Sequence, residues 1–251
     1  MIFTPHRGTH ALSSFNVNMV SIKGNKGVDF GEVEAKKHNL WIGISLSNKI
    51  FTPENIKSLI LFCLEHTKDR VLVWIPGRMQ ATNYRYFERM GRADALKKGF
   101  AEEDVCKKAI KQILNELPKE KAEKVVIANF DDTCTSKYIK QREIFFRAFS
   151  EKGKFYDSVM EIIEEVIIAR GRPVNKDNKE SLALYIIHEL PLFCDGAQKI
   201  GDDTIYTVIP YPGFGKIDEL EMDIIEGSKY PEITQKLGLT NKVGILDVSF
   251  E

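Results

Sequence analysis

The residue that could act as a nucleophile in this chain is a serine at the end of an apolar run. Ser45 closes the run 39–45, and Gly43 lies two positions before it. If the run is a strand, the Ser45 hydroxyl lies at the carboxyl edge of a sheet, where Gly43 leaves room for a substrate. A serine that only caps a turn is the alternative, and the second glycine of a Gly-x-Ser-x-Gly elbow is missing. Asn48 could orient a substrate carbonyl or form a turn.

A tyrosine and a glutamate share one face of a predicted helix far downstream. Tyr185 and Glu189 are four positions apart, so both project from the same side. Their neighbours on that face are apolar, so the carboxylate is either half-buried and paired or placed to hold an ammonium group. An exposed glutamate near a helix end is the alternative. We expect Pro191 to end this helix and His188 to be a surface or capping residue.

A second tyrosine follows another apolar run. Tyr211 and Pro212 come directly after the run 205–210. If the sheet is parallel, Tyr211 lies at the same edge as Ser45, where a phenol can relay a proton. An aromatic plug in a turn is the alternative. Without an obvious histidine base, the set of Ser45, Tyr185, Glu189 and Tyr211 indicates an enzyme that forms an acyl-serine and passes the acyl group to an amine.

A locally basic region could bind a phosphate backbone. Residues 78–111 contain nine basic and five acidic residues in a chain with 36 of each. We expect three arginines to share a face of a helix over 84–98, and three lysines to line the next helix: Arg85, Arg89, Arg92, Lys107, Lys108 and Lys111. Such stripes are usually solvated faces, but two in succession beside an acyl site suit nucleic acid.

The elements that must position these residues alternate along the chain. The apolar, β-branched runs 39–45, 71–76, 124–130 and 205–210 are continuous, as in parallel strands covered on both faces, and 243–248 is a possible last strand. Helical periodicity separates them, at 53–66, 84–98, 103–117, 137–150, 155–169 and 179–189. The pattern predicts one doubly wound α/β domain over residues 1–251, with ligands at the carboxyl ends of the strands.

Composition excludes several other classes of protein. The 251 residues are 43% apolar and carry no net charge, which removes any global attraction to nucleic acid or membrane. The four cysteines form no CxxC pair, so we expect no metal site. No stretch approaches the ~18 apolar residues of a membrane span. We therefore expect a soluble, cytoplasmic protein that does not bind membranes and, lacking a P-loop or a GxGxxG motif, uses no nucleotide cofactor.

Together these motifs resemble the tRNA-dependent cyclodipeptide synthases. The resemblance runs from about Asn39 to Gly215 and rests on the segment 40–45, the Tyr-x3-Glu-x-Pro pattern of 185–191, and Tyr211-Pro212. The Tyr-Pro pair is similar to the branch of the family with proline at this position. Where the family pattern has a histidine four positions before the glycine, this chain has Asn39 beside His38.

The resemblance implies a Rossmann-like fold similar to the catalytic domains of class I aminoacyl-tRNA synthetases. It implies two aminoacyl-tRNAs per turnover, with no ATP, metal or other cofactor. Ser45 would carry first an aminoacyl and then a dipeptidyl group, from which a diketopiperazine is released. Tyr185 and Glu189 would hold the ammonium, Gly43 would line the pocket, Tyr211 would place or relay protons, and the basic helix near 103–116 would guide the tRNA.

Three other functions remain open at this stage. A class I aminoacyl-tRNA synthetase would need an ATP-binding histidine motif and a lysine-serine loop, to which the segment 135–137 is only weakly similar. A serine hydrolase would need a placed histidine, such as His188 or His38. A tRNA-binding module would use the arginine surface but not Ser45 or Glu189.

Overall fold

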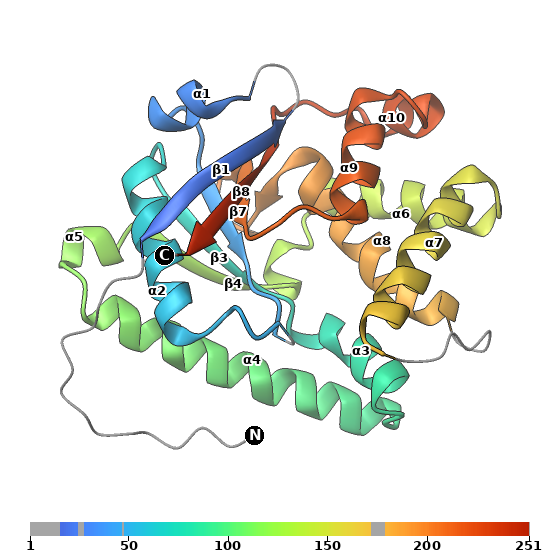
Figure 1. The fold of residues 1–251 in the computed structure, drawn as a ribbon, viewed down its shortest axis with the longest axis horizontal. Helices are drawn as coiled ribbons and strands as arrows, with labels where there is room; N and C mark the ends of the chain where they lie inside the picture. The colour runs from blue at the N-terminus through green and yellow to red at the C-terminus, as the bar shows by residue number, and fades with distance from the viewer. Residues whose placement is uncertain (1–15, 25–27, 47, 172–178, 251) are drawn as a thin grey trace.

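The computed structural model describes residues 16–24, 28–46, 48–171 and 179–250. Within them, a six-stranded sheet lies between layers of helices (Figure 1). The strands of this sheet are β1 (Val17–Gly24), β2 (Leu40–Gly43), β3 (Val71–Ile75), β4 (Val125–Asn129), β7 (Val208–Tyr211) and β8 (Gly244–Phe250). The α-helices are α1 (Phe30–Glu34), α2 (Pro53–His66), α3 (Gln80–Phe87), α4 (Arg92–Asn115), α5 (Lys119–Ala122), α6 (Ser136–Ser150), α7 (Lys154–Ala169), α8 (Lys179–Asp195), α9 (Lys216–Glu226) and α10 (Pro231–Leu237).

The sheet has the order β1-β8-β7-β2-β3-β4. Strands β8, β7, β2, β3 and β4 are parallel, and β1 pairs antiparallel with β8 at the edge. A separate two-stranded sheet joins β5 (Ala197–Gln198) to β6 (Ile205–Tyr206). The predicted α/β class with a parallel central sheet is confirmed.

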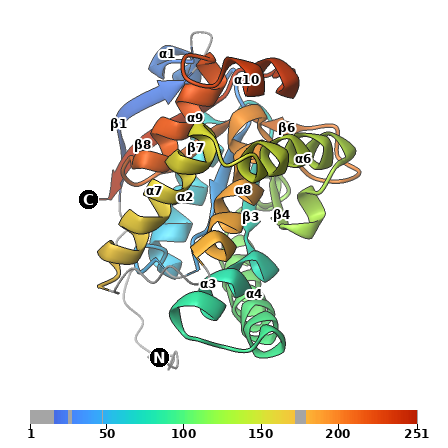
Figure 2. The same ribbon diagram turned by 90° about the vertical axis from the view of Figure 1, so that its right-hand side faces the viewer.

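The apolar runs form parallel strands because both faces of the sheet are buried. Leu40 and Ile42 of β2 pack on one face with α2 and α4, whereas Trp41 packs on the other face with residues of α6 and α8. Beyond that second layer, α6, α7, α8, α9 and α10 share a core of their own. Figure 2 shows α6, α7, α8 and α9 gathered on this side of the sheet. A strand with helices on both faces can have no polar side, which explains the unbroken apolar runs.

Several predicted elements match closely. The predicted helix 53–66 is α2, whose cap Thr52 accepts a hydrogen bond from the Asn55 amide at 3.2 Å and is followed by Pro53. The predicted runs near 39–45, 71–76, 124–130 and 243–248 are β2, β3, β4 and β8. The run 205–210 divides into β6 and β7, because Thr207 leaves the first pairing and its amide donates to Asn39.

The predicted helix 84–98 is wrong, whereas the predicted helix 103–117 lies, except for its last two residues, within the longer helix α4. Helix α3 ends at Phe87, because Arg89 adopts φ = 55°, a left-handed conformation that a helix cannot continue through. Gly91 then precedes α4, which runs unbroken over 24 residues. Arg85, Arg89 and Arg92 therefore do not lie on one helix face: they lie in α3, in the turn and at the start of α4.

The prediction that Pro191 ends its helix is also wrong. Helix α8 continues to Asp195 with Pro191 inside it. The core around α8 offsets the backbone hydrogen bond that proline cannot make, since Leu190, Pro191 and Leu192 are all buried. Strand β1 and helices α9 and α10 were not predicted. In the part of the chain that the structure describes, no helix is long and apolar enough to cross a membrane.

Candidate active site

The candidate site lies where the order of the strands in the sheet reverses. After β2 the chain builds β3 and β4 on one side, and it later places β7 and β8 on the other side. In the described sheet, a single registered pair, Leu40 with Val208, joins β2 to β7. Toward their carboxyl ends no registered pair joins the two strands. In α/β sheets such a switch point is the usual place for a ligand.

A cavity of about 470 Å³ opens at this point. Gly43, Ser45, Tyr211 and Pro212 line it from the ends of β2 and β7. Tyr185 and Glu189 line it from α8. Its remaining walls are mainly apolar side chains of α7, α8 and β7, among them Ile162, Ile163, Val166, Leu182, Ile186, Phe193 and Ile209. The structure thus brings residues from distant parts of the chain into one enclosure.

Ser45, Asn48 and Tyr211 form a hydrogen-bonded group at the strand ends. Asn48 Nδ2 donates to the Tyr211 hydroxyl at 3.5 Å, and the Tyr211 hydroxyl also interacts with Ser45. The Asn48 amide also donates to the Ser45 carbonyl at 3.0 Å, which forms the turn after β2. Burial raises the pKa of Tyr211, so its phenol keeps its proton. A serine hydroxyl beside a protonated phenol is suited to proton transfer as an ester exchanges its oxygens.

Tyr185 and Glu189 are paired as their spacing predicts. The Tyr185 hydroxyl and the Glu189 carboxyl interact closely enough to shift each other's pKa. The pKa of Glu189 is raised to about 8: burial has the largest effect, the interaction with Tyr185 lowers the pKa, and the nearby Asp218 raises it. Burial also holds the pKa of Tyr185 far above its ordinary value. Ionisation of a carboxyl with this pKa is costly, and a nearby cation offsets that cost. The pair therefore suits a substrate ammonium.

Two further carboxyls behind this pair were not predicted. Asp218 of α9 lines the cavity, and its Oδ2 accepts a hydrogen bond from the Gly215 amide at 2.5 Å. Glu221, one turn later, is fully buried, and neither of its carboxyl oxygens has a hydrogen-bond partner among the described residues. Its pKa is raised well above the ordinary value by burial and then by Asp218 and Glu189. The spacing from Gly215 to Asp218 is the one signal in the sequence, because it is typical of a helix cap.

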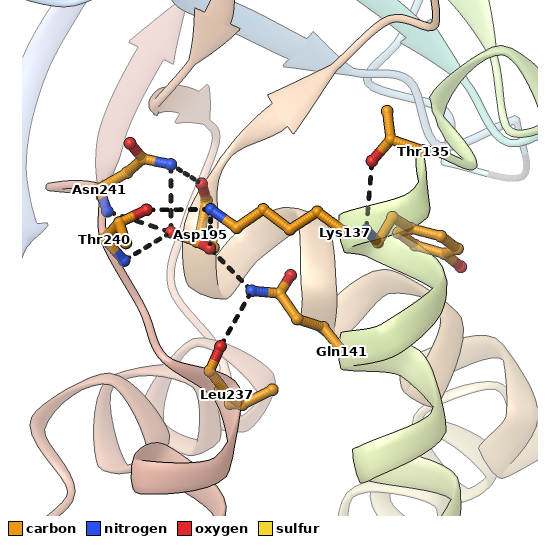
Figure 3. Close-up of polar contacts among 8 residues, drawn as sticks. Thr135, Lys137, Gln141, Asp195, Leu237, Thr240 and Asn241 are labelled. Atoms are coloured by element: carbon orange, nitrogen blue, oxygen red, sulfur yellow. Dashed lines mark hydrogen bonds and ion pairs between the residues drawn. The ribbon is translucent and has the colours of Figure 1, made fainter.

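The carboxyl end of α8 is fixed by a dense polar cluster (Figure 3). Asp195, 2% exposed, pairs with Lys137 Nζ at 2.5 Å and accepts from Gln141 Nε2 at 2.7 Å. The amides of Thr240 and Asn241 donate to its other oxygen, each at 3.1 Å. This cluster joins α6, α8 and the segment before β8, so it fixes the helix that carries Tyr185 and Glu189. Lys137 is thus engaged in a structural ion pair, where the synthetase reading would need a mobile loop lysine.

Neither histidine weighed for a hydrolase lies among the residues that line the cavity. His38, 8% exposed, bridges Glu32 Oε2 and Thr207 Oγ1, each at 3.1 Å, at the opposite edge of the sheet. The expectation that His188 is a surface or capping residue is wrong. Its ring lies between Phe130 and Phe146, at 5.3 and 5.5 Å, and burial lowers its pKa to about 4.

Asn39 has a structural position instead of a catalytic one. Its side-chain oxygen accepts hydrogen bonds from the amides of Asp69 and Arg70, at 2.9 and 3.0 Å. These contacts fix the loop before β3 to the amino end of β2, away from Ser45. The asparagine at this point therefore stabilises the sheet edge.

The predicted basic residues lie outside the cavity, on α3, α4 and the turn between them. Arg85, Arg89, Arg92, Lys108 and Lys111 are exposed. Lys107 differs, because its ammonium contacts the buried carboxylate of Glu103. Glu103 also accepts a hydrogen bond from Asn129 Nδ2 at 2.7 Å. Gly77 has φ = 52°, and the Glu103 carboxylate occupies the space that a Cβ atom on residue 77 would need. Gly77 is thus required for α4 to pack against the ends of β3 and β4.

Comparisons with known proteins agree with this geometry. The family model for cyclodipeptide synthases matches residues 31–212. The chain is similar to a cyclodipeptide synthase from Bacillus thermoamylovorans, with a TM-score of 0.73 and 18% identity over 96% of this chain and 98% of that chain. No curated protein sequence matches it significantly.

Two other solved structures are similar. One is the Mycobacterium tuberculosis protein reported to relate cyclodipeptide synthetases to type I tRNA synthetases, with a TM-score of 0.70 and 16% identity over 92% of this chain and 93% of that chain. The other is a cyclodipeptide synthase from Candidatus Glomeribacter gigasporarum bound to Phe-tRNAPhe, with a TM-score of 0.51 and 9% identity over 84% and 87%. At these identities the structures show the shared fold, whereas the family model shows membership. Because that model spans 182 of the 251 residues and takes in the whole cluster from Ser45 to Tyr211, this chain belongs to the cyclodipeptide synthase family and is an enzyme of that class.

Proposed function

We propose that this enzyme joins the aminoacyl groups of two aminoacyl-tRNAs into a diketopiperazine through an acyl group on Ser45. The observation that carries the proposal is the meeting of Ser45, Tyr211 and the Tyr185–Glu189 pair in one cavity. The relative from Candidatus Glomeribacter gigasporarum, solved with Phe-tRNAPhe, supports tRNA as the carrier. The substrate ester is already activated, so the reaction requires neither ATP nor a metal ion. A supply of aminoacyl-tRNA also favours a cytoplasmic location.

In the first step, Ser45 Oγ attacks the aminoacyl ester. The new bond joins Oγ to the acyl carbon, and the bond that breaks joins this carbon to the terminal ribose oxygen. The serine proton must reach that leaving oxygen. Tyr211 lies beside Ser45 in the cavity and keeps its proton in the resting enzyme, so it can pass one proton while accepting another.

The amine of the acyl group is held by the Tyr185–Glu189 pair. In the empty enzyme, Glu189 titrates at about pH 8 because burial disfavours its charge. An ammonium placed beside it restores the charged form, and Tyr185 supplies a hydrogen bond to the same carboxylate. This arrangement fixes the acyl group against Ser45 while the second substrate enters.

Two further acyl transfers complete the reaction. The amine of the acyl-enzyme attacks the second aminoacyl ester, forming the first peptide bond and releasing the second tRNA. The free amine of the dipeptide then attacks the Ser45 ester, forming the second peptide bond and returning the proton to Ser45. The cavity walls are largely apolar, and such walls disfavour water, the competing nucleophile. They also favour aminoacyl groups with apolar side chains.

The exposed residues of α3, the turn and α4 would bind the tRNA. Arg85, Arg89, Arg92, Lys108 and Lys111 form a surface suited to phosphates, and Lys107 contributes less because Glu103 neutralises it. We further propose that Pro212 lines the substrate pocket, as in the branch with proline after this tyrosine. The described helices and strands pack around one sheet, which supports a single domain over 1–251.

Mass spectrometry of cyclodipeptides from bacteria that express the chain tests this function. We expect a product from the wild type and from Ser136→Ala, an exposed control serine on α6, but none from Ser45→Ala. Because Ser45→Ala removes a single oxygen, the fold should be unchanged by circular dichroism. An acyl adduct on Ser45 in the wild type would confirm the covalent step. Full turnover by Ser45→Ala would exclude it.

A further inference from the structure

An arginine outside the predicted set lines the cavity. Arg170 follows the last residue of α7 and lines the same enclosure as Ser45 and Glu189. Its guanidinium is close enough to Tyr185 and Tyr84 to interact with both hydroxyls electrostatically. Arg170 is thus a cation within the site that neither the predicted acyl chemistry nor the predicted basic surface includes.

The guanidinium of Arg170 is oriented by an aromatic ring. Its Cζ lies 4.3 Å from the centre of the Phe87 ring, the last residue of α3. Stacking of this kind restricts the side chain, so less entropy is lost when the guanidinium binds a ligand. Burial lowers the pKa of Arg170, but an arginine remains charged in this setting. The structure therefore holds a positive charge, oriented by Phe87, among the residues that line the cavity.

The position of Arg170 joins the cavity to the exposed arginines. Phe87, which it contacts, directly precedes the turn that carries Arg89, and α4 begins at Arg92. Figure 1 shows the lower end of α7 beside α3 and the start of α4. A nucleic acid strand that lies on the exposed arginines and ends at Ser45 can therefore run past Arg170. In this path Arg170 lies closest to the reacting ester.

Lys216 also lines the cavity but is less suited to an incoming anion. Its ammonium is neutralised by Glu161, at 2.7 Å, and by Glu165. Arg170 presents five N–H donors in a planar fork, so it can bind a phosphate alongside its existing contacts. A bidentate fork matches a phosphodiester better than an ammonium does.

We propose that Arg170 binds the phosphodiester that precedes the terminal adenosine of the aminoacyl-tRNA. This inference rests on the proposed function, since it concerns the RNA that delivers the acyl group. Arg170 would fix the terminal ribose, and thus the ester, opposite Ser45. Its contribution is to substrate binding and positioning, because the bonds that change lie at the ester carbon.

Removal of charge from both partners tests this contact. The probes are two RNA hairpins that carry no amino acid and have an acceptor stem ending in CCA. One carries the natural last phosphodiester and the other a neutral methylphosphonate there. Fluorescence anisotropy at low salt measures their affinity for the wild type, Arg170→Ala, Arg170→Lys and Arg147→Ala. Arg147 is an exposed arginine of α6 that is not among the residues lining the cavity, and it is the matched control.

We expect the methylphosphonate to weaken wild-type binding about tenfold, as loss of one charge-assisted contact does. Arg170→Ala should bind the natural hairpin about tenfold more weakly and should no longer distinguish the two RNAs. Arg170→Lys should fall between them, and Arg147→Ala should match the wild type. Independent losses in the variant and the RNA, or a wild type that does not distinguish the hairpins, would overturn the proposal.

Steady-state kinetics separates a positioning role from damage to the fold. Arg170→Ala should raise KM for aminoacyl-tRNA about tenfold while kcat falls less than about threefold. An equal fall in kcat together with a lower melting temperature would show a structural role instead. If the wild type makes no cyclodipeptide, the proposed function fails, and the hairpin experiment still decides whether Arg170 meets a phosphate.

Discussion

Helix α8 carries two carboxylates with opposite surroundings. Asp195, at its end, is surrounded by donors from α6 and from the segment before β8 (Figure 3). Glu189, six residues earlier, lines a cavity, interacts with Tyr185 and is repelled by Asp218. An anion at a helix C-terminus is unfavourable in itself, and Lys137 offsets this at Asp195. The substrate would supply the corresponding cation at Glu189.

Asp195 therefore stabilises the fold, whereas the Glu189 carboxyl lowers the stability of the empty enzyme. Each donor to the Asp195 carboxylate loses one acceptor if the carboxylate is removed. Removal of the Glu189 carboxylate instead relieves a desolvation cost that the empty enzyme bears. We therefore expect a substitution at Asp195 to lower mainly stability and a substitution at Glu189 to lower mainly activity.

The largest expected effect is on stability, at Asp195. Asp195→Ala should lower the free energy of unfolding by about 3–5 kcal/mol, because it leaves the Thr240 and Asn241 amides without their acceptor and takes one acceptor from Lys137. Urea denaturation of the purified protein measures it. Lys137→Ala removes the partly exposed member of the pair and should cost less. A loss below about 1 kcal/mol for Asp195→Ala would show that the cluster does not fix α8.

Glu189→Gln tests the opposite behaviour. Cyclodipeptide formation should fall by about 2–4 kcal/mol of transition-state stabilisation, roughly 30- to 1000-fold, because the ammonium loses its counter-charge. The melting temperature should be unchanged or higher, since glutamine can still accept the Tyr185 hydrogen bond without a buried charge. Product yield and thermal unfolding are measured on the same preparation. A destabilised but active Glu189→Gln variant would reverse the comparison.

Glu221 extends the comparison to a carboxyl outside the cavity lining. Glu221→Met should raise the free energy of unfolding by about 1–3 kcal/mol, because the native carboxyl is fully buried and has no hydrogen-bond partner among the described residues. Glu219→Met, at an exposed position of the same helix, is the control and should change stability little. Calorimetry measures both variants. A loss of stability in Glu221→Met would mean that a polar contact fixes Glu221 in solution.

Much of the fold could be predicted because burial leaves a direct trace in the sequence. Strands covered on both faces are continuously apolar, so β2, β3, β4 and β8 were recognisable, as were α2, α6 and α7. The break between α3 and α4 could not be predicted. It depends on the left-handed conformation of Arg89, which an arginine in the sequence does not indicate. Pro191 misled for the opposite reason: tertiary packing around α8 overrides a local helix breaker.

Neighbours within the candidate site could be predicted where spacing or an edge position carries the information. Tyr185 and Glu189 pair within one helix, and Ser45 and Tyr211 meet because two parallel strands end at the same edge. Asp218, Glu221 and Arg170 were missed, since each reaches its place only through packing between helices far apart in the sequence. His188 has no pattern that distinguishes an enclosed ring from an exposed one.

The smallest expected effect sharpens the comparison within the cavity itself. Asp218 raises the pKa of Glu189 by repulsion, after the larger effect of burial. Glu189 must be ionised to take the ammonium, so in the wild type kcat/KM should rise with pH toward about 8. Asp218→Asn removes the repulsion and should move this rise to lower pH by less than about one unit, or about 1.4 kcal/mol.

Stability provides the independent check on the same shift. Glu189 has a folded-state pKa of about 8 against 4.5 ordinarily, so the folded protein binds the extra proton between these values. Its contribution to stability is therefore present below about pH 4.5 and is lost as the pH rises toward 8. In Asp218→Asn the loss should end at a lower pH, and urea unfolding between pH 5 and 8 measures it. If neither profile moves, burial alone sets the Glu189 pKa, and Asp218 does not tune the ammonium site.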